Sequence, residues 1–378
     1  MYEQMDGSGI QQIHFRDLVL GTPAVRVSQR TINGNIFGGN GHSLRPEISG
    51  DGQIIVFHSF ASNLVPDDKN EHSDVFLYRV LNGQLVRAIN SITGEEGNGP
   101  SYYPTLNHDG SLVTFHSKAN NIHVNVDWLA KPIHQQIYLW DTTIGTFGEI
   151  TVVTKGNDES RHPFISGTGN VIVFESDASD IVPDPNGDGI DNNATDIYAL
   201  DTVSQDYSVL SLTEDLKETN GPSWQPTVSK DGKVAAFVSS ASNMITGRGI
   251  SVITVENGGG GYFGNPTIIV TDNRNPSFGE GAILSLQNGI DEHGQILPEG
   301  VTILNSGRNY IDPVVTILAD PNEPPPLQQA IIKAHLTHPL GDIYRVELDS
   351  VGSSLERISQ GPDGVGGDGL SREPSLND

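Results

Sequence analysis

The strongest constraint on the fold is a motif that the chain repeats five times. In each copy a serine is followed three residues later by proline, and in the first four copies a strand-like run comes next. The copies begin at Ser43, Ser101, Ser160, Ser223 and Ser371. The first four starts lie 58, 59 and 63 residues apart and the fifth follows after 148. Such a near-constant period indicates stacked copies of one supersecondary unit.

Each copy predicts two strands joined by a tight turn. In the first copy Gly50-Asp51-Gly52 forms the turn, because glycine supplies the positive φ of a hairpin. The β-branched and aromatic run that follows, ending at Phe57, forms the second strand. A further pair of strands is predicted from each of Asp74, Gln136, Asp196 and Asp342, and another pair from Gln12. Four antiparallel strands make one propeller blade, so the chain is predicted to be all-β, a β-propeller with four full blades.

The two ends and one inserted segment depart from this regularity. The chain is predicted to open on the third strand of a blade and to stop after a first strand, which gives partial blades at both termini. Either the two ends join in one composite blade that lacks its second strand, or the chain is a fragment of a larger propeller, which is favoured. The predicted organisation is propeller over 1–249, a small inserted glycine-rich β domain over 250–336, and propeller again over 337–378. The insert carries its own repeat, in which Tyr262 and Tyr310 lie 48 residues apart. These tyrosines either stack on a sugar or pack a small core, and core packing is favoured.

The first copy also carries a family resemblance. Ser49-Gly50-Asp51-Gly52, Phe57, Ala61–Pro66 and Asp74-Val75-Phe76 together resemble the TolB-type, WD-like β-propeller repeat. The resemblance covers most of the chain outside 250–336. It implies the fold more than the activity, because such propellers serve as binding scaffolds, as accessory domains of peptidases and, rarely, as metal-dependent sugar enzymes. The insert is similar to a Gly-Gly-x-Gly-Tyr β-repeat of bacterial surface and virion proteins.

Composition argues against some partners and compartments. Asp and Glu number 47 against 21 Lys and Arg, and the net charge of −26 opposes binding to nucleic acid. No apolar run approaches the roughly 18 residues of a membrane span. The start of the chain lacks the basic-then-apolar order of a signal peptide. An acidic, repetitive chain without cysteine suits an extracellular, cell-surface or periplasmic protein.

The most specific chemical pattern lies between the second and third strands of the third blade. Oxygen-bearing side chains at alternate positions, followed by glycine, are typical of the start of a calcium loop. The candidate ligands are Asp184, Asn186, Asp188, the carbonyl of Ile190, Asn192 and Asp196. Thr195 stands where an EF-hand has its glutamate, so the loop is predicted to be helix-free and not an EF-hand. A bound Ca2+ would then order the loop and have a structural role. The alternative is a solvated turn without a metal ion. A weaker version of the pattern comprises Asp67, Asp68, Asn70 and Asp74.

Two more positions recur in the units and are predicted to form a ligand pocket. The residues just before the repeat prolines are Arg45, Tyr103, His162 and Gln225, and the residues just after the repeated phenylalanine include His58, His116 and Glu175. Both sets belong to the face that carries the long connectors, called the looped face below, where function is expected. His58 and His116 are either partners of neighbouring loop backbone or, together with the glutamate, approach one metal ion. Joint ligation is strained, because blades lie about 10 Å apart.

These observations leave several functions open. No Ser-His-Asp order, nucleophile elbow or His-Glu-x-x-His motif is present, so no catalytic residue is assigned. The leading hypothesis is a non-enzymatic, calcium-supported propeller that binds a protein or glycan through its looped face. One alternative is a metal-dependent polysaccharide lyase or hydrolase, which requires His58, His116, His162 and Glu175 to converge on one point. Another is an accessory propeller of a larger enzyme.

Overall fold

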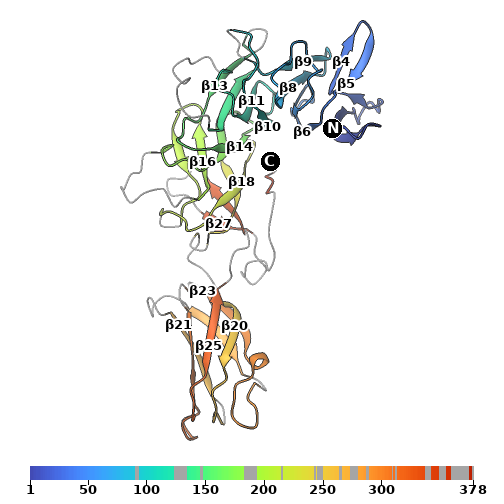
Figure 1. Ribbon diagram of the computed structural model, residues 1–378. Coiled ribbons are helices and arrows are strands. Elements are labelled where there is room, and N and C mark those ends of the chain that lie inside the picture. The colour runs from blue at the N-terminus through green and yellow to red at the C-terminus, as the bar shows by residue number, and fades with distance from the viewer. Residues whose placement is uncertain are drawn as a thin grey trace.

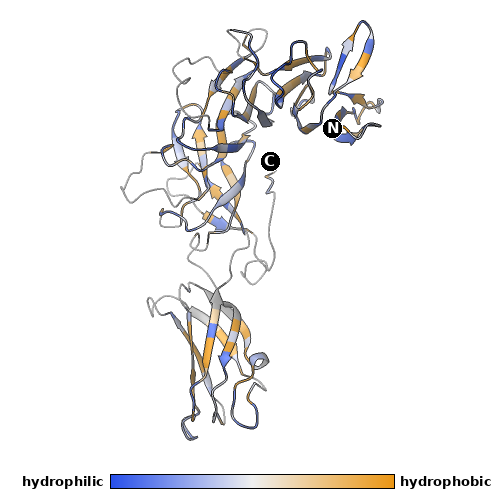
Figure 2. Ribbon diagram, in the orientation of Figure 1, coloured by the Kyte–Doolittle hydropathy of each residue, from blue (hydrophilic) through white to orange (hydrophobic). Residues whose placement is uncertain are grey.

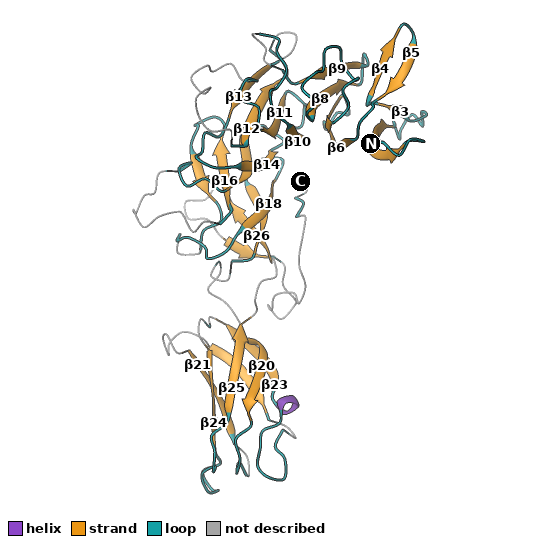
Figure 3. Ribbon diagram, viewed as in Figure 1, coloured by secondary structure: helices purple, strands orange, loops and turns teal. Residues whose placement is uncertain are grey.

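The computed structural model describes residues 1–89, 93–122, 134–144, 148–182, 194–213, 216–241, 244, 250–263, 266–272, 280–286, 289–308, 310, 313–336, 342–348, 355–358 and 374–376. Over these residues the chain consists of strands and loops, with one short 3-10 helix, η2 (Pro298–Gly300) (Figure 3). No helix in this part of the chain is long and apolar enough to cross a bilayer. The prediction of an all-β protein is confirmed.

Four sheets are antiparallel meanders of four strands, the strand order of a propeller blade. Blade 1 consists of β6 (Ser43–Ile48), β7 (Ile54–Ser59), β8 (Asp74–Arg79) and β9 (Gln84–Arg87), and blade 2 consists of β10 (Ser101–Leu106), β11 (Leu112–Ser117), β12 (Gln136–Asp141) and β13 (Glu149–Val152). Blade 3 consists of β14 (Ser160–Ile165), β15 (Val171–Ser176), β16 (Asp196–Asp201) and β17 (Tyr207–Val209). Blade 4 consists of β18 (Ser223–Val228), β19 (Val234–Ser239), β26 (Asp342–Glu347) and β27 (Leu355–Arg357). In blade 4 the insert separates β19 from β26, yet the two strands pair in register, with Phe237 opposite Tyr344.

The segment between β19 and β26 builds sheets of its own, which form a lobe apart from the blades (Figure 1). One sheet has the order β20 (Ile250–Asn257), β25 (Ile331–Leu336), β24 (Pro313–Leu318) and β21 (Thr267–Asp272), and β22 (Glu280–Ser285) pairs with β23 (Thr302–Arg308). Tyr262 and Tyr310 are 1% and 3% exposed, and the Tyr262 hydroxyl accepts the N–H of Ala330 at 2.9 Å. Neither tyrosine presents its ring for a sugar to stack on.

The N-terminal residues correct one expectation. β1 (Tyr2–Met5), β2 (Gln11–Phe15) and β3 (Val25–Arg26) form a sheet, and β4 (Gln29–Ile32) and β5 (Asn35–Gly38) form a hairpin. The prediction that the chain opens on the third strand of a blade is wrong, because β1 pairs with β2 where a second strand belongs. The Tyr2 and His14 rings stack 5.6 Å apart, as Phe57 and Phe76 do in blade 1. The match escapes notice in the sequence because tyrosine replaces the repeated phenylalanine.

The repeated phenylalanine occupies the same slot in every blade. Phe57, Phe115, Phe174 and Phe237 are fully buried. Each stacks on the aromatic residue opposite it on the third strand, with ring centroids between 5.6 and 6.1 Å apart. Such pairs add about 0.5–1.5 kcal/mol to the free energy gained by burial. Equivalent surroundings for all four rings are what a stack of like blades requires.

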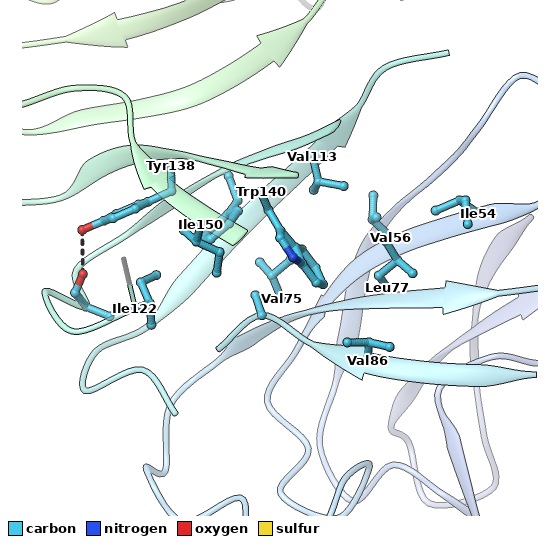
Figure 4. Close-up of a cluster of buried hydrophobic side chains, with 13 residues drawn as sticks. Ile54, Val56, Val75, Leu77, Val86, Val113, Ile122, Tyr138, Trp140 and Ile150 are labelled. Atoms are coloured by element: carbon cyan, nitrogen blue, oxygen red, sulfur yellow. Dashed lines mark hydrogen bonds between the residues drawn. The ribbon is translucent and has the colours of Figure 1, made fainter. Parts of the chain in front are cut away.

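Successive blades pack face to face through buried apolar side chains. Hydrophobic residues recur along the blade strands (Figure 2). Between blades 1 and 2, Val56 and Leu77 belong to the same buried cluster as Val113 and Trp140 (Figure 4). The Tyr138 hydroxyl at the end of this cluster donates to the carbonyl of Ala119 at 2.7 Å. The interface therefore buries aromatic surface without leaving that polar group unpaired.

The Asp-Gly turns and their equivalents link neighbouring blades on the face opposite the looped face. The N–H of Gly50 donates to the carbonyl of His108 at 2.7 Å, and the N–H of His108 donates to the carbonyl of Gly167 at 2.9 Å. Gly110 has a φ of 71°, and a Cβ at this position would lie 2.7 Å from Ile54 of blade 1, so only glycine fits. With the first strands of successive blades also in contact, the β-propeller prediction is confirmed.

The serine that opens each repeat closes the inner hairpin of its blade. Ser43 Oγ lies 2.9 Å from Ser59 Oγ, and the equivalent pair recurs at 2.9 Å in blades 2, 3 and 4. Ser59 Oγ also accepts the N–H of Ala61 at 3.1 Å, where the connector leaves the strand. Because these buried hydroxyls satisfy one another and the backbone, the serines of the motif are structural.

Candidate functional site

A cavity of about 510 Å³, called the axial cavity below, lies where the first strands of the four blades meet. Its wall includes the residue before the repeat proline in each blade: Arg45, Tyr103, His162 and Gln225. Glu3 from β1, Glu47 from β6 and the repeat prolines complete much of the lining, and Pro374 of the fifth copy also reaches it. The structure thus brings together four pre-proline side chains that lie up to 180 residues apart in the sequence.

The pre-proline residues share an unusual backbone conformation. Their φ angles are 52°, 51°, 49° and 54° for Arg45, Tyr103, His162 and Gln225. Strand pairing shifts register at each of these points, which places a β-bulge at the cavity wall. A left-handed conformation costs about 1–3 kcal/mol in a residue other than glycine, and a following proline disfavours helical conformations further. Strain at four equivalent positions needs compensating contacts.

Those contacts come from the preceding blade. His116 Nδ1 accepts the N–H of His162 at 3.0 Å, and Glu175 Oε1 accepts the N–H of Gln225 at 2.7 Å. Glu3 Oε1 accepts the N–H of Arg45 at 2.8 Å in the same way. His116 and Glu175 therefore hold the bulges of the next blade, which agrees with the backbone-partner alternative for His116. Glu3 was missed from the sequence, although Tyr2-Glu3 occupies the register of Phe57-His58.

His58 stands at the same position in blade 1 but has no such partner. It is 4% exposed, and its Nδ1 is buried without a hydrogen bond. The ring of Tyr103 lies over it, with centroids 5.9 Å apart. Burial, with a smaller effect of the Arg45 cation, lowers the pKa of His58 to about 4, and burial also lowers the pKa of His116 well below its usual value. Both histidines are neutral at pH 7, so each retains an acceptor nitrogen.

A charged network runs from the axial cavity outwards along blade 3. His162 Nδ1 lies 3.0 Å from Glu175 Oε1, and Glu175 Oε2 accepts Arg161 Nε at 3.1 Å. Arg161 also binds Asp177, with Nη1 2.6 Å from Oδ2, and donates to Thr195 Oγ1 at 2.9 Å. The Glu175 carboxylate thus has partners on both oxygens.

The four side chains required by the metal hypothesis form a row instead of a cage. His116 and His162 have ring centroids 5.6 Å apart and His162 adjoins Glu175, but Tyr103 lies against both His58 and His116. His116 Nδ1 is already engaged with backbone. Across the described ranges, no group of three or more histidine, aspartate and glutamate side chains is placed to hold a metal ion. This arrangement does not favour the lyase or hydrolase alternative.

The predicted calcium loop lies almost entirely outside the described residues. This holds for Asp184, Asn186, Asp188, Ile190 and Asn192. The remaining candidate, Asp196, is buried at the start of β16 and accepts Ser211 Oγ at 2.6 Å. Burial raises the pKa of Asp196 to about 6, and the Ser211 hydrogen bond opposes that shift. The calcium site stays a prediction.

The weaker calcium pattern in blade 1 has a different explanation. Arg87 on β9 places Nη1 at 3.3 Å from Asp68 Oδ1, 3.1 Å from Asp74 Oδ2 and 3.0 Å from Glu96 Oε2. The Arg87 guanidinium supplies a positive charge between Asp68 and Asp74, so this arrangement does not favour a calcium ion there. Three carboxylates around one cation leave an excess of negative charge, and burial raises the pKa of Asp74 to about 6 despite Arg87.

No family model matches the chain, and no curated protein is similar to it in sequence. Solved structures with a similar backbone include TolB from Acinetobacter baumannii, at 16% identity and a TM-score of 0.37 over 85% of this chain and 61% of that one. A putative TolB from Agrobacterium tumefaciens has 14% identity and a TM-score of 0.34, over 79% and 94% of the two chains. A nidogen/laminin complex has 8% identity and a TM-score of 0.30, over 56% and 66%. The chain spans less than two thirds of the Acinetobacter protein.

Proposed function

We propose that this chain is a non-enzymatic β-propeller scaffold that binds a protein or glycan ligand in the axial cavity of its looped face. The observation that carries the proposal is the convergence of four strained pre-proline residues on one cavity. Backbone strain concentrates at ligand sites, where the surrounding structure holds it in place. Here the holding groups are His116, Glu175 and Glu3, all in the preceding sheet.

The lining suits recognition better than chemistry. Proline rings and Tyr103 supply apolar surface, while Arg45 and Gln225 supply hydrogen-bonding groups, the usual composition of a binding pocket. The Arg45 guanidinium lies 5.0 Å from the centroid of the Tyr103 ring, so a rigid aromatic face and a cation are presented together. An acidic chain without cysteine fits a position in the cell envelope or outside the cell, and this location belongs to the proposal.

Screening the complete chain on glycan and peptide arrays tests the binding role. The Arg45→Ala substitution removes an exposed cavity side chain and its contact with Tyr103, and we expect it to weaken binding of any array ligand at least tenfold. Arg16→Ala is the matched control, because Arg16 is an exposed arginine in the β2–β3 loop, away from the cavity lining. If both variants bind with the same affinity as the wild type, the ligand binds outside the axial cavity. If no array ligand binds the chain, the proposed binding role is rejected.

Calcium is proposed as a structural ion of the loop from Asp184 to Asp196. For a dissociation constant of about 1 mM, typical of extracellular modules, 10 mM calcium would add about 1.4 kcal/mol to the free energy of unfolding. The melting temperature should therefore rise by a few degrees with calcium and fall again with chelator. Asp188→Ala should abolish the response, and Asp231→Ala, an exposed turn aspartate in blade 4, should keep it. A melting temperature that does not change with calcium would contradict the proposal.

A further inference from the structure

We propose that the axial cavity selects ligands that carry an organic cation, an alkylammonium or a guanidinium group, and that Glu47 receives this charge. The inference rests on the proposed binding role and names the chemistry of its ligand. Glu47 follows the repeat proline of blade 1 and lines the cavity. Its counterparts in blades 2, 3 and 4 are Thr105, Phe164 and Thr227, which also line the cavity and carry no charge.

Among the residues that the structure describes, Glu47 has no counter-ion. Among the described residues no lysine, arginine or histidine nitrogen lies within ion-pair distance of it. Arg45, two residues earlier on β6, directs its guanidinium to the Tyr103 ring of the next blade. The other acid, Glu3, is occupied by the N–H of Arg45 and by Gln11 Nε2 at 3.3 Å.

Burial dominates the electrostatics of Glu47. It raises the pKa of Glu47 to about 7, and the backbone N–H of Leu106 opposes the shift. The ionisable groups that face the cavity from the surrounding strands are Glu3 on β1, Arg45 on β6, Tyr103 on β10 and His162 on β14, with His58 on β7 behind them. None of these groups contributes to the Glu47 shift. A half-protonated carboxyl in a concave, proline-lined wall is therefore complementary to a ligand cation.

Binding of a cation to Glu47 must release a proton. The ligand charge favours the carboxylate, which lowers the pKa of Glu47 in the complex, so binding and deprotonation are linked. For a pKa of about 7 that falls by two units or more in the complex, the apparent affinity rises about tenfold between pH 6 and pH 8. At pH 7 about half a proton leaves per ligand bound. A neutral ligand of the same length shows neither effect.

Isothermal titration of the complete chain tests this with two cationic probes, spermidine and an acetylated, amidated Gly-Gly-Lys-Gly-Gly peptide. 1,8-Octanediol serves as the neutral probe. Titrations in two buffers of different ionisation enthalpy count the protons released at pH 7. We expect at least one cationic probe to bind with about tenfold higher affinity at pH 8 than at pH 6. Tighter binding of spermidine would indicate a free polyamine as the ligand, and tighter binding of the peptide would indicate a protein side chain.

The Glu47→Gln variant keeps the shape of the side chain and removes its charge. We expect it to bind the cationic probe at least tenfold more weakly at pH 8 and to lose the pH dependence. Its melting temperature at pH 6 should be no lower than that of the wild type, because the raised pKa of Glu47 costs the wild type stability above the ordinary value of 4.5. Cation binding that is independent of pH in the wild type, or that Glu47→Gln leaves intact, overturns the inference. If no cation binds while array ligands still depend on Arg45, this inference fails and the proposed function stands. If neither binds, both fail.

Discussion

Replacing Arg87 with methionine is expected to lower the free energy of unfolding by about 3–5 kcal/mol at pH 8, the usual cost of removing one partner from a buried ion pair. The Arg87 side chain is 8% exposed, and those of Asp68 and Asp74 are 3% exposed. Methionine fills a similar volume, so the loss of stability comes from the removed charge more than from lost packing. Without the guanidinium, the two buried carboxylates and Glu96 repel one another across a few ångströms.

The pH dependence of this loss follows from Asp74. Its pKa is raised to about 6 by burial in the folded protein, against 3.8 as the ordinary value, so the folded state binds the proton more tightly than the unfolded state. The stability that protonation of Asp74 provides is present below about pH 4 and is lost as the pH rises through 6. Removing Arg87 moves this pKa higher still. The deficit of Arg87→Met should therefore be largest above pH 7 and should shrink at pH 5.

Urea unfolding of the complete chain at pH 5 and pH 8 measures both effects. Lys118→Met is the control, because the Lys118–Glu159 ion pair is more exposed, with 42% and 34% of the side chains accessible. An exposed pair contributes about 0–1 kcal/mol, and we expect a change within that range at both pH values. Adding Asp74→Asn to Arg87→Met should recover part of the loss at pH 8. A deficit independent of pH would mean that packing around Arg87, and not charge, is what the substitution removes.

The fold was predictable because its chemistry repeats. In each blade the repeated serine forms a hydroxyl pair, the repeated proline follows a β-bulge, and the repeated phenylalanine stacks on an aromatic ring. Because every blade needs these three features in the same place, the three residues recur at constant offsets. The N-terminal sheet shows where this reasoning stops. β1 keeps the register and the stacking of a second strand, but Tyr2 replaces the repeated phenylalanine, so the sequence shows no repeat there.

The sequence predicted which residues line the candidate site but not the contacts that they make. The offset from the repeat proline identified Arg45, Tyr103, His162 and Gln225, because equivalent residues of stacked blades meet at the axis. The sequence does not reveal that His116 and Glu175 bind the backbone of the next blade, since that depends on the left-handed conformation of a residue about 50 positions away. The roles of Glu47 and Arg87 follow from burial and from partners that only the folded chain brings near.

Truncating the repeated phenylalanine of blade 2, Phe115→Ala, is expected to lower the free energy of unfolding by about 3–5 kcal/mol, the usual cost of emptying a buried aromatic site. Phe115 is fully buried between blades 1 and 2, and its ring stacks on Tyr138 with centroids 5.7 Å apart. The substitution removes apolar burial and the aromatic pair together and leaves a cavity that rigid strands on both sides cannot fill. Urea unfolding and hydrogen exchange in β11 and β12 measure the loss.

Phe37→Ala provides the matched control, because Phe37 is 48% exposed on the β4–β5 hairpin and belongs to no blade. We expect a change of about 0.5 kcal/mol or less, as for other surface substitutions. Since Phe57, Phe174 and Phe237 occupy equivalent slots, their truncation should cost amounts within about 2 kcal/mol of the Phe115 value. Four widely different costs, or a Phe115 cost no larger than that of Phe37, would contradict the equivalence of the blades, and with it the convergence of the pre-proline residues on one axis.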